Sequence, residues 1–179
     1  MLDSAGVRYE AIPADLDESA IKSELDRPED VARELAEAKA LSVSRDRPAD
    51  LVIGSDSVVT VGGRMFDKPT GRGQAEEHLR LFSGEEMRLT SAVALARNGQ
   101  VEWRQADTAI LELRPLSDSF IRAYLDAEWP QVGYCVGVFR LEGRGVQLFD
   151  RIHGDYFTIL GMPLIPLLGA LRERQVLPA

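Results

Sequence analysis

Asp56 is a carboxylate in the middle of an otherwise apolar stretch that extends from residue 51 to residue 61. The apolar and β-branched side chains favour a buried strand, but Gly-Ser-Asp-Ser at positions 54–57 interrupts them with a flexible residue and a charge. A Gly-Gly pair follows and is typical of a tight hairpin, so we expect the chain to fold back and return Asp67 and Lys68 toward Asp56. One acid and one ammonium would then face a common cleft.

Each of these residues also has a structural explanation. Asp and Ser beside Gly in a strand often mark a bulge or an Asx turn, and a Lys after a hairpin is usually a solvated charge. Buried carboxylates are structural as often as they are functional. The residues alone therefore leave open whether Asp56 is catalytic.

Several sequence blocks, taken in order, resemble the Maf family. The blocks are GSDSVV at 54–59, DKP at 67–69, SG at 83–84, LEGRG at 141–145 and GDYFTILGMPL at 154–164. Together they extend over nearly the whole chain. The resemblance implies a nucleoside triphosphate pyrophosphatase, which hydrolyses the α–β phosphoanhydride of non-canonical, modified or pyrimidine nucleoside triphosphates to a monophosphate and pyrophosphate.

The resemblance also implies roles for individual residues. Asp56 corresponds to the catalytic base of the family, and Lys39 and Lys68 correspond to lysines that bind phosphates as compact point charges. Glu18 corresponds to an acidic residue near the substrate and the metal. Glu142 stands where many relatives carry Gln. Its carboxylate is either a second metal ligand or an acceptor of hydrogen bonds from the nucleotide base of the substrate, and both interpretations stay open.

The implied reaction explains these residue types. A water attacks the α-phosphorus while pyrophosphate leaves, so the site needs a carboxylate to orient or deprotonate the water and cations to neutralise the triphosphate. Mg²⁺ binds few carboxylates and keeps several waters, so Asp56 with Glu18 and the phosphates would hold a divalent cation, Mg²⁺ or Mn²⁺.

Length and composition fit one small enzyme domain that covers residues 1–179. The chain has 45% hydrophobic and 28% charged residues, a net charge of −8 and a single cysteine, Cys135. The acidic balance argues against nucleic acid or an anionic membrane as a partner. The lone cysteine cannot form an internal disulfide, and we expect a cytoplasmic protein that binds a nucleoside triphosphate; a homodimer stays open.

Periodicity and turn signals predict an α/β fold with a mixed sheet and flanking helices. We expect strands at 7–13, 88–96, 101–114, 133–139 and 145–149, and helices that begin at Pro28, Ser117 and Leu164 and one that covers 74–82. An Asn-Gly pair should join the two central strands in a hairpin. The resemblance implies that the curved sheet forms a central cleft between two lobes, as in the inosine triphosphate pyrophosphatases.

Other reactive side chains fit structural roles better. His78 should lie on the polar face of its helix, and with His153 as the other histidine the chain lacks the ligand spacing of a zinc site. Cys135 lies in an apolar stretch that favours the core. Trp103 and Trp129 could stack on a base, although packing is the commoner role of an indole.

Residues 1–5 resemble the last turn and cap of a helix. Maf proteins usually begin with a strand, a Ser-rich loop and a phosphate-binding Arg ahead of such a helix. Either translation begins upstream of Met1, or the chain is a natural truncation that has lost that arginine. In the second case the alternative function is a catalytically weak, nucleotide-binding regulatory protein.

Overall fold

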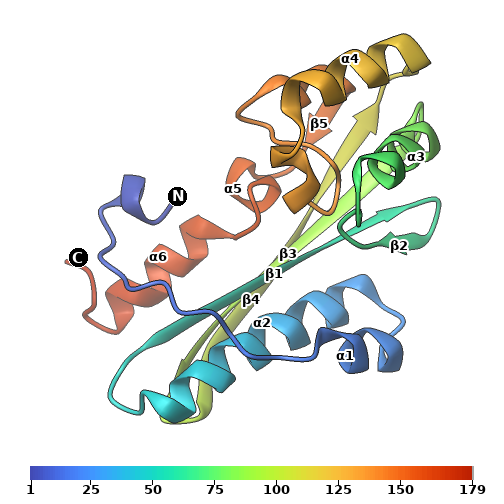
Figure 1. The fold of residues 1–179 in the computed structure, drawn as a ribbon. Coiled ribbons are helices and arrows are strands. Elements are labelled where there is room, and N and C mark those ends of the chain that lie inside the picture. The colour runs from blue at the N-terminus through green and yellow to red at the C-terminus, as the bar shows by residue number, and fades with distance from the viewer. Residues whose placement is uncertain (179) are drawn as a thin grey trace. The chain divides into compact units, whose positions relative to one another are not determined.

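The structure is a computed structural model that describes residues 1–178, and it contains one five-stranded sheet with helices beside it (Figure 1). The strands are β1 (Val52–Val61), β2 (Arg64–Phe66), β3 (Glu86–Arg97), β4 (Gln100–Leu113) and β5 (Phe149–His153). Their order is β2-β1-β3-β4-β5, with antiparallel pairing of β1 with β2 and of β4 with β5. The helices are α1 (Glu18–Glu24), α2 (Pro28–Asp46), α3 (Arg72–Phe82), α4 (Asp118–Glu128), α5 (Tyr156–Ile159) and α6 (Leu164–Glu173). The predicted α/β class is confirmed.

Residue contacts divide the chain into two compact units. Unit 1 comprises residues 1–57, 90–107 and 155–179, and unit 2 comprises residues 58–89 and 108–154. The long strands β1, β3 and β4 each contribute one part to either unit. The prediction of a single domain stays a prediction. No helix within residues 1–178 is both long and apolar enough to cross a lipid bilayer.

In unit 1, helices cover both faces of the strands. Helix α2 packs so closely on β1 that a Cβ on Gly54 would lie 2.3 Å from the carbonyl oxygen of Ala36. Helix α6 contributes Leu167 and Leu171 to a core cluster with Val93 and Leu95 of β3. Ile53, on the opposite face of β1 from Gly54, packs against this cluster. The alternation of side chains along β1 thus assigns α2 to one face and α6 to the other.

In unit 2, helices α3 and α4 pack against each other. Helix α3 buries Phe82, whose ring meets that of Phe66 edge to face at 4.8 Å. The position predicted for His78 on a polar face is wrong, because its side chain is buried beside the same two rings. An imidazole offers apolar surface as well as nitrogen, so periodicity alone does not decide which face carries it.

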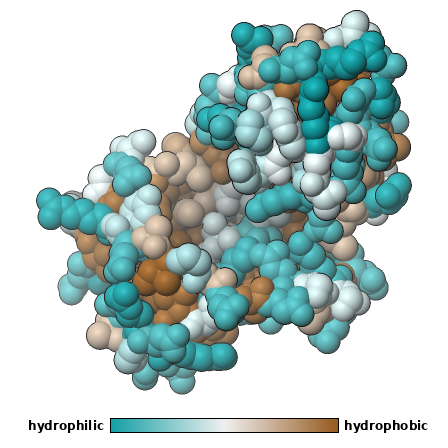
Figure 2. Space-filling view, in the orientation of Figure 1, coloured by the Kyte–Doolittle hydropathy of each residue, from teal (hydrophilic) through white to brown (hydrophobic). Residues whose placement is uncertain are grey.

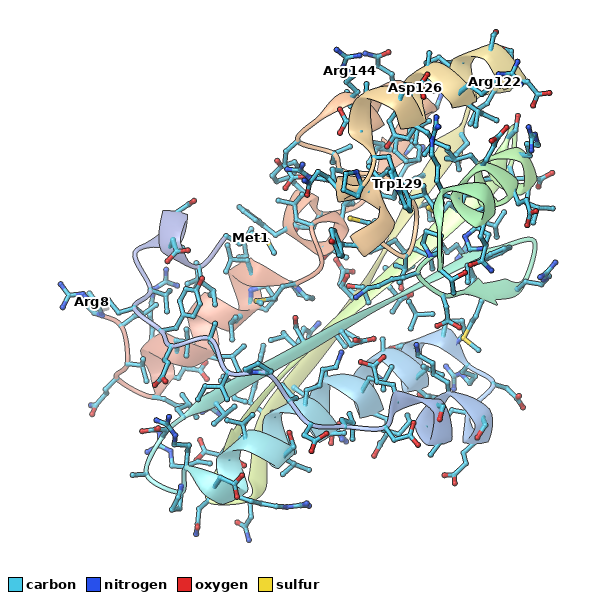
Figure 3. The ribbon with its side chains drawn as sticks, viewed as in Figure 1. Met1, Arg8, Arg122, Asp126, Trp129 and Arg144 are labelled. Carbon is cyan, nitrogen blue, oxygen red and sulfur yellow. The ribbon has the colours of Figure 1, made fainter. Side chains whose placement is uncertain are left out.

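The indoles take part in packing. Trp103 lies against the core cluster of unit 1, and Trp129 follows the last turn of α4 in unit 2 (Figure 3). A Cβ on Gly133 would come within 2.8 Å of the Trp129 ring, so the ring lies directly on the backbone there.

Elements with strong local signals form as predicted. Pro28 occupies the first turn of α2, Ser117 caps α4 by accepting a hydrogen bond from the N–H of Phe120, and α6 covers Leu164–Glu173. Asn98 and Gly99 both adopt positive φ angles in the turn between β3 and β4. Residues 3–5 form a short 3₁₀ helix that Gly6 ends in the left-handed conformation.

Three strand predictions are wrong. The structure assigns no strand to residues 7–13, which belong to an irregular segment that passes alongside α6 toward α1 (Figure 1). The stretches 133–139 and 145–149 overlap the 3₁₀ helices Gln131–Tyr134 and Arg144–Leu148, and the strand begins only at Phe149. The apolar residues at 133–139 and 145–149 include buried ones, and short irregular segments bury such residues as well as strands do, whereas residues 8–13 are exposed.

Candidate active site in unit 1

Gly54 sets the distance between β1 and α2. Besides the close approach to Ala36, a Cβ on Gly54 would lie 2.5 Å from the backbone nitrogen of Ala40. Any larger residue would push the helix off the strand. Because side chains two apart in a strand share a face, Asp56 also points to the side of α2. Lys39, one turn after Ala36, lies on the same side of the helix.

Three of the predicted site residues come together here. The Nζ of Lys39 donates a hydrogen bond to Asp56 Oδ1 at 2.5 Å and lies 2.8 Å from Glu18 Oε1. Side-chain exposure is 13% for Asp56, 25% for Lys39 and 38% for Glu18, so the acid on the strand is the most enclosed of the three. One ammonium therefore bridges a buried and a half-exposed carboxylate.

The two acids have pKa values shifted in opposite directions. Burial raises the pKa of Asp56, and the hydrogen bond from Lys39 offsets this only in part. The hydrogen bond from Lys39 lowers the pKa of Glu18. Burial by itself would lower the pKa of Lys39, but its bonds to both acids outweigh that effect and raise it. Asp56 is thus the more basic carboxylate, and Lys39 stays charged.

Glu18 owes its place to a helix that the sequence analysis missed. Asp17 caps α1 by accepting a hydrogen bond from the N–H of Ser19, and Glu18 is the first helical residue. In the sequence, the capping residue Asp17 and the acid at the helix start are the features that favour a helix here. Lys22, one turn later, forms an ion pair with Glu18 at 3.4 Å.

Lys39 and Glu18 line a pocket of about 950 Å³ within unit 1. Its other walls come from the irregular segment at 7–14, the first residues of β1 and part of α6. Figure 2 shows that hydrophobic residues gather on this face in the region where α6 and the N-terminal segment lie in Figure 1. The pocket therefore combines an apolar wall with a charged one, as sites for amphipathic small molecules do.

A hydrogen-bonded chain fixes the strand next to Asp56. Ser57 Oγ lies 2.7 Å from Ser91 Oγ, and Ser91 Oγ donates to the carbonyl oxygen of Thr158 at 2.7 Å. Thr158 Oγ1 in turn donates to Asp107 Oδ2 at 2.8 Å. Ser91 and Thr158 are fully buried, so these bonds are shielded from water. This series of hydrogen bonds connects β1 to β3, β4 and α5 at Ser57, the residue that follows Asp56.

The remaining predicted residues, Lys68 and Glu142, belong to unit 2, and the charges of both act on Cys135. The charges of Arg140, Glu142 and Lys68 all act on the Cys135 thiol, although burial is the main reason that its pKa is raised. The thiol is half-buried, and its raised pKa lowers the share of thiolate at neutral pH, in keeping with the interpretation of Cys135 as a packed residue.

The acids of unit 1 fit a hard divalent cation that keeps several waters. Asp56 and Glu18 supply two carboxylates that share one ammonium, and Mg²⁺ takes one or two protein carboxylates together with phosphate oxygens. Within residues 1–178 there is no group of three or more His, Cys, Asp and Glu side chains with the arrangement of a metal site. The donor set thus does not suit a cation held by protein ligands alone.

Comparison with known proteins identifies the family. Residues 1–174 match the family model described as Maf, Maf-like protein. A 7-methyl-GTP pyrophosphatase of Rhizobium etli is 46% identical over 177 residues, which cover 97% of this chain and 89% of that protein. A nucleoside triphosphate pyrophosphatase of Rhodopseudomonas palustris is 44% identical over 179 residues, which cover 99% of this chain and 89% of that protein. This chain therefore belongs to the Maf family.

Proposed function

We propose that this chain is a nucleoside triphosphate pyrophosphatase, a hydrolase that converts a nucleoside triphosphate to a monophosphate and pyrophosphate. The family match and the names of the relatives support this reaction. The observation that carries it is the pair of Asp56 and Lys39 beside a pocket large enough for a nucleotide. A buried carboxylate of raised pKa is a suitable proton acceptor, and an adjacent ammonium is a suitable phosphate ligand.

Asp56 would act on the attacking water. As the water oxygen bonds to the α-phosphorus, the bond from that phosphorus to the bridging oxygen breaks, and pyrophosphate leaves with the bonding electrons. Asp56 accepts the proton of the water, for which the raised pKa of its carboxyl is favourable. Lys39 stabilises the negative charge that builds on the phosphate oxygens.

A divalent cation, Mg²⁺ or Mn²⁺, would be held by Asp56 and Glu18 together with the phosphates. When bound, it would neutralise phosphate charge and so stabilise the leaving group. The net charge of −8 supports this part of the proposal, because a chain with so many acids offers few clustered cations to a triphosphate.

In this proposal, Lys68 and Glu142 of unit 2 are substrate-binding residues. Lys68 would bind phosphate oxygens, and Glu142 would contribute to recognition of the base or the metal. The relatives named 7-methyl-GTP pyrophosphatase make 7-methyl-GTP the first modified nucleotide to test, beside ordinary pyrimidine triphosphates. The cytoplasmic location and the homodimer stay predictions.

The alternative, a regulatory protein that binds nucleotides with weak catalysis, is less favoured. Relatives named as pyrophosphatases match 97% or more of this chain, and the Asp56–Lys39 pair is fully formed in the structure. The regulatory alternative would be distinguished by tight binding of a nucleotide without turnover.

Product analysis tests the proposal. The full chain is incubated with 7-methyl-GTP and with each ordinary nucleoside triphosphate in Mg²⁺ or Mn²⁺, and the products are separated by chromatography. We expect a monophosphate and pyrophosphate, and no release after addition of a chelator. Orthophosphate and a diphosphate as first products would replace this reaction with that of a simple phosphatase, and binding without turnover would favour the regulatory alternative.

A further inference from the structure

Helix α4 holds the segment that carries Glu142 at two points. Tyr124 donates a hydrogen bond from its hydroxyl to the carbonyl oxygen of Val138 at 3.0 Å, and Glu128 Oε1 accepts one from the backbone N–H of Arg144 at 3.3 Å. Tyr124 and Glu128 are four residues apart, so they lie on one face of the helix. Figure 3 shows Arg144 beside α4. Glu142 lies between the two held points.

Residues 140–145 of this segment form a compact turn in which backbone atoms lie close together. The N–H of Gly143 donates to the carbonyl oxygen of Arg140 at 3.2 Å, and a Cβ on Gly145 would lie 2.5 Å from that same oxygen. A Cβ on Gly143 would lie 3.1 Å from Glu128 Oε2. The two glycines thus let backbone pack on backbone and on the Glu128 carboxylate, which leaves the turn little freedom to move once both ends are held.

Val138, the residue at which this segment begins, has an unfavourable backbone conformation. Val138 has a φ of +56°, in the left-handed region that β-branched residues rarely adopt. Such strain persists only where surrounding contacts impose it, and it is commonest at functional sites. The hydrogen bond from the buried Tyr124 hydroxyl is one of those contacts. Without it, the segment would gain by relaxing away from its present position.

We infer that Tyr124 and Glu128 are positioning residues that fix the Glu142 turn for substrate binding. The effect that we expect from Tyr124 and Glu128 on activity rests on the proposed function, because the position of Glu142 affects catalysis only if Glu142 contacts the substrate. The holding of the turn by α4 does not depend on that function. Loss of either hydrogen bond should therefore raise KM by about three- to tenfold, while kcat changes less.

Cys135 offers a readout of the turn that needs no activity. It is the one cysteine of the sequence, it is half-buried, and the groups that act on its pKa are Arg140, Glu142 and Lys68. The charge of Glu142 raises the pKa of the thiol. The charge of Arg140, at the start of the same turn, lowers it. When the turn loosens, the effects of Arg140 and Glu142 on the thiol both change, so the pKa of Cys135 should shift away from its value in the parent chain.

The test compares Glu128→Ala with Glu128→Gln. Both remove the same charge, but only Gln keeps an oxygen that can accept the bond from the N–H of Arg144. The rate of Cys135 alkylation by iodoacetamide is measured against pH by mass spectrometry, and KM and kcat are measured by pyrophosphate release. We expect Glu128→Ala to shift the pKa of Cys135 and raise KM, and Glu128→Gln to stay close to the parent chain.

Two further variants complete the test. Tyr124→Phe should act like Glu128→Ala, and in a background that carries both Arg140→Gln and Glu142→Gln neither should change the pKa of Cys135 further. The positioning role is refuted if Glu128→Ala leaves both the thiol titration and KM unchanged, or if Glu128→Gln behaves like Glu128→Ala. If no nucleotide is hydrolysed by the parent chain, the proposed function fails, and the thiol titration still decides whether α4 holds the turn.

Discussion

At the residue scale, Asp56 combines burial with a charged partner. Its carboxylate keeps only 13% exposure on the folded chain, and Lys39 is its hydrogen-bonded cation. Burial of an ionised carboxyl costs free energy, which is why its pKa is raised. A residue that costs stability in this way and lies beside a pocket is a candidate for function, because functional sites often conflict with stability.

Asp56→Asn should lower turnover by about 10²–10⁴-fold, since the amide has the shape of the carboxyl without its basicity. The raised pKa means that ionised Asp56 destabilises the fold above its folded pKa, so the variant should unfold at the same or a higher temperature at neutral pH. Pyrophosphate release and thermal unfolding measure the two effects. Asp46→Asn, on an exposed residue of α2, is the control and should change neither. Near-normal turnover of Asp56→Asn would make Asp56 structural.

Glu18 should make a stabilising contribution that depends on pH. The bond from Lys39 holds the pKa of Glu18 below its ordinary value of 4.5, so its contribution is present above that value and disappears as pH falls through the folded pKa. Because solvent reaches Glu18, Glu18→Gln should cost about 0.2–1 kcal/mol at neutral pH and nothing in strong acid. Urea unfolding at several pH values measures this. Glu24→Gln in the same helix is the matched control; an equal loss there would show a general helix effect.

At the element scale, the contact of α2 with β1 determines the site. The helix places Lys39 and the strand places Asp56, and both depend on the absence of a side chain at Gly54. A change at this contact should therefore affect stability and catalysis together.

Gly54→Ala should destabilise the fold by about 1–3 kcal/mol, because the new Cβ would overlap the backbone of α2. The same displacement should separate Lys39 from Asp56 and lower turnover. Gly73→Ala is the matched control, since a Cβ there would meet nothing within 4 Å and Ala is the better helix former by about 1 kcal/mol. Unfolding in urea and pyrophosphate release measure both variants. Equal effects at the two glycines would contradict the close packing.

At the scale of the whole molecule, segments far apart in sequence meet in unit 1 through buried polar groups. Ser57 and Ser91 are 34 residues apart, and Ser91 and Thr158 are 67 apart. Together with Asp107 they link strands from three parts of the chain to the segment that leads into α6. These bonds, added to the apolar cluster around Leu167, hold unit 1 together.

Ser91→Ala should destabilise the protein by about 0.5–1.5 kcal/mol, because it removes a buried hydrogen bond to the carbonyl oxygen of Thr158, which keeps the N–H of Gly161 as its other donor. The loss of order should extend to residues 155–163, which hydrogen exchange with mass spectrometry can detect. The control is Ser23→Ala, whose exposed hydroxyl bonds only within α1 and should matter little. Normal exchange at 155–163 in the Ser91 variant would show that the apolar cluster alone holds this segment.

Local chemistry explains how much of the fold and site was predictable. The Pro28 start, the Ser117 cap and the Asn98-Gly99 turn each act on their own neighbours, and each was correct. Residues 7–13 have the alternation of a strand but form none, because a strand also needs a partner and alternation does not supply one. The pairing of Glu18 with Lys39 was absent from the predictions, since it joins two different helices.

The sequence by itself determined the helices α2, α3, α4 and α6, the turn between β3 and β4, the family and the set of candidate residues, because these depend on side chains at fixed, short spacings. Only the tertiary structure decided which candidates meet. Lys39 reaches both Asp56 and Glu18 because α2 lies against Gly54, whereas Lys68 and Glu142 belong to the other unit, where their charges act on Cys135. Contacts between distant segments depend on how whole elements pack, and packing depends on all their surfaces together rather than on any local spacing.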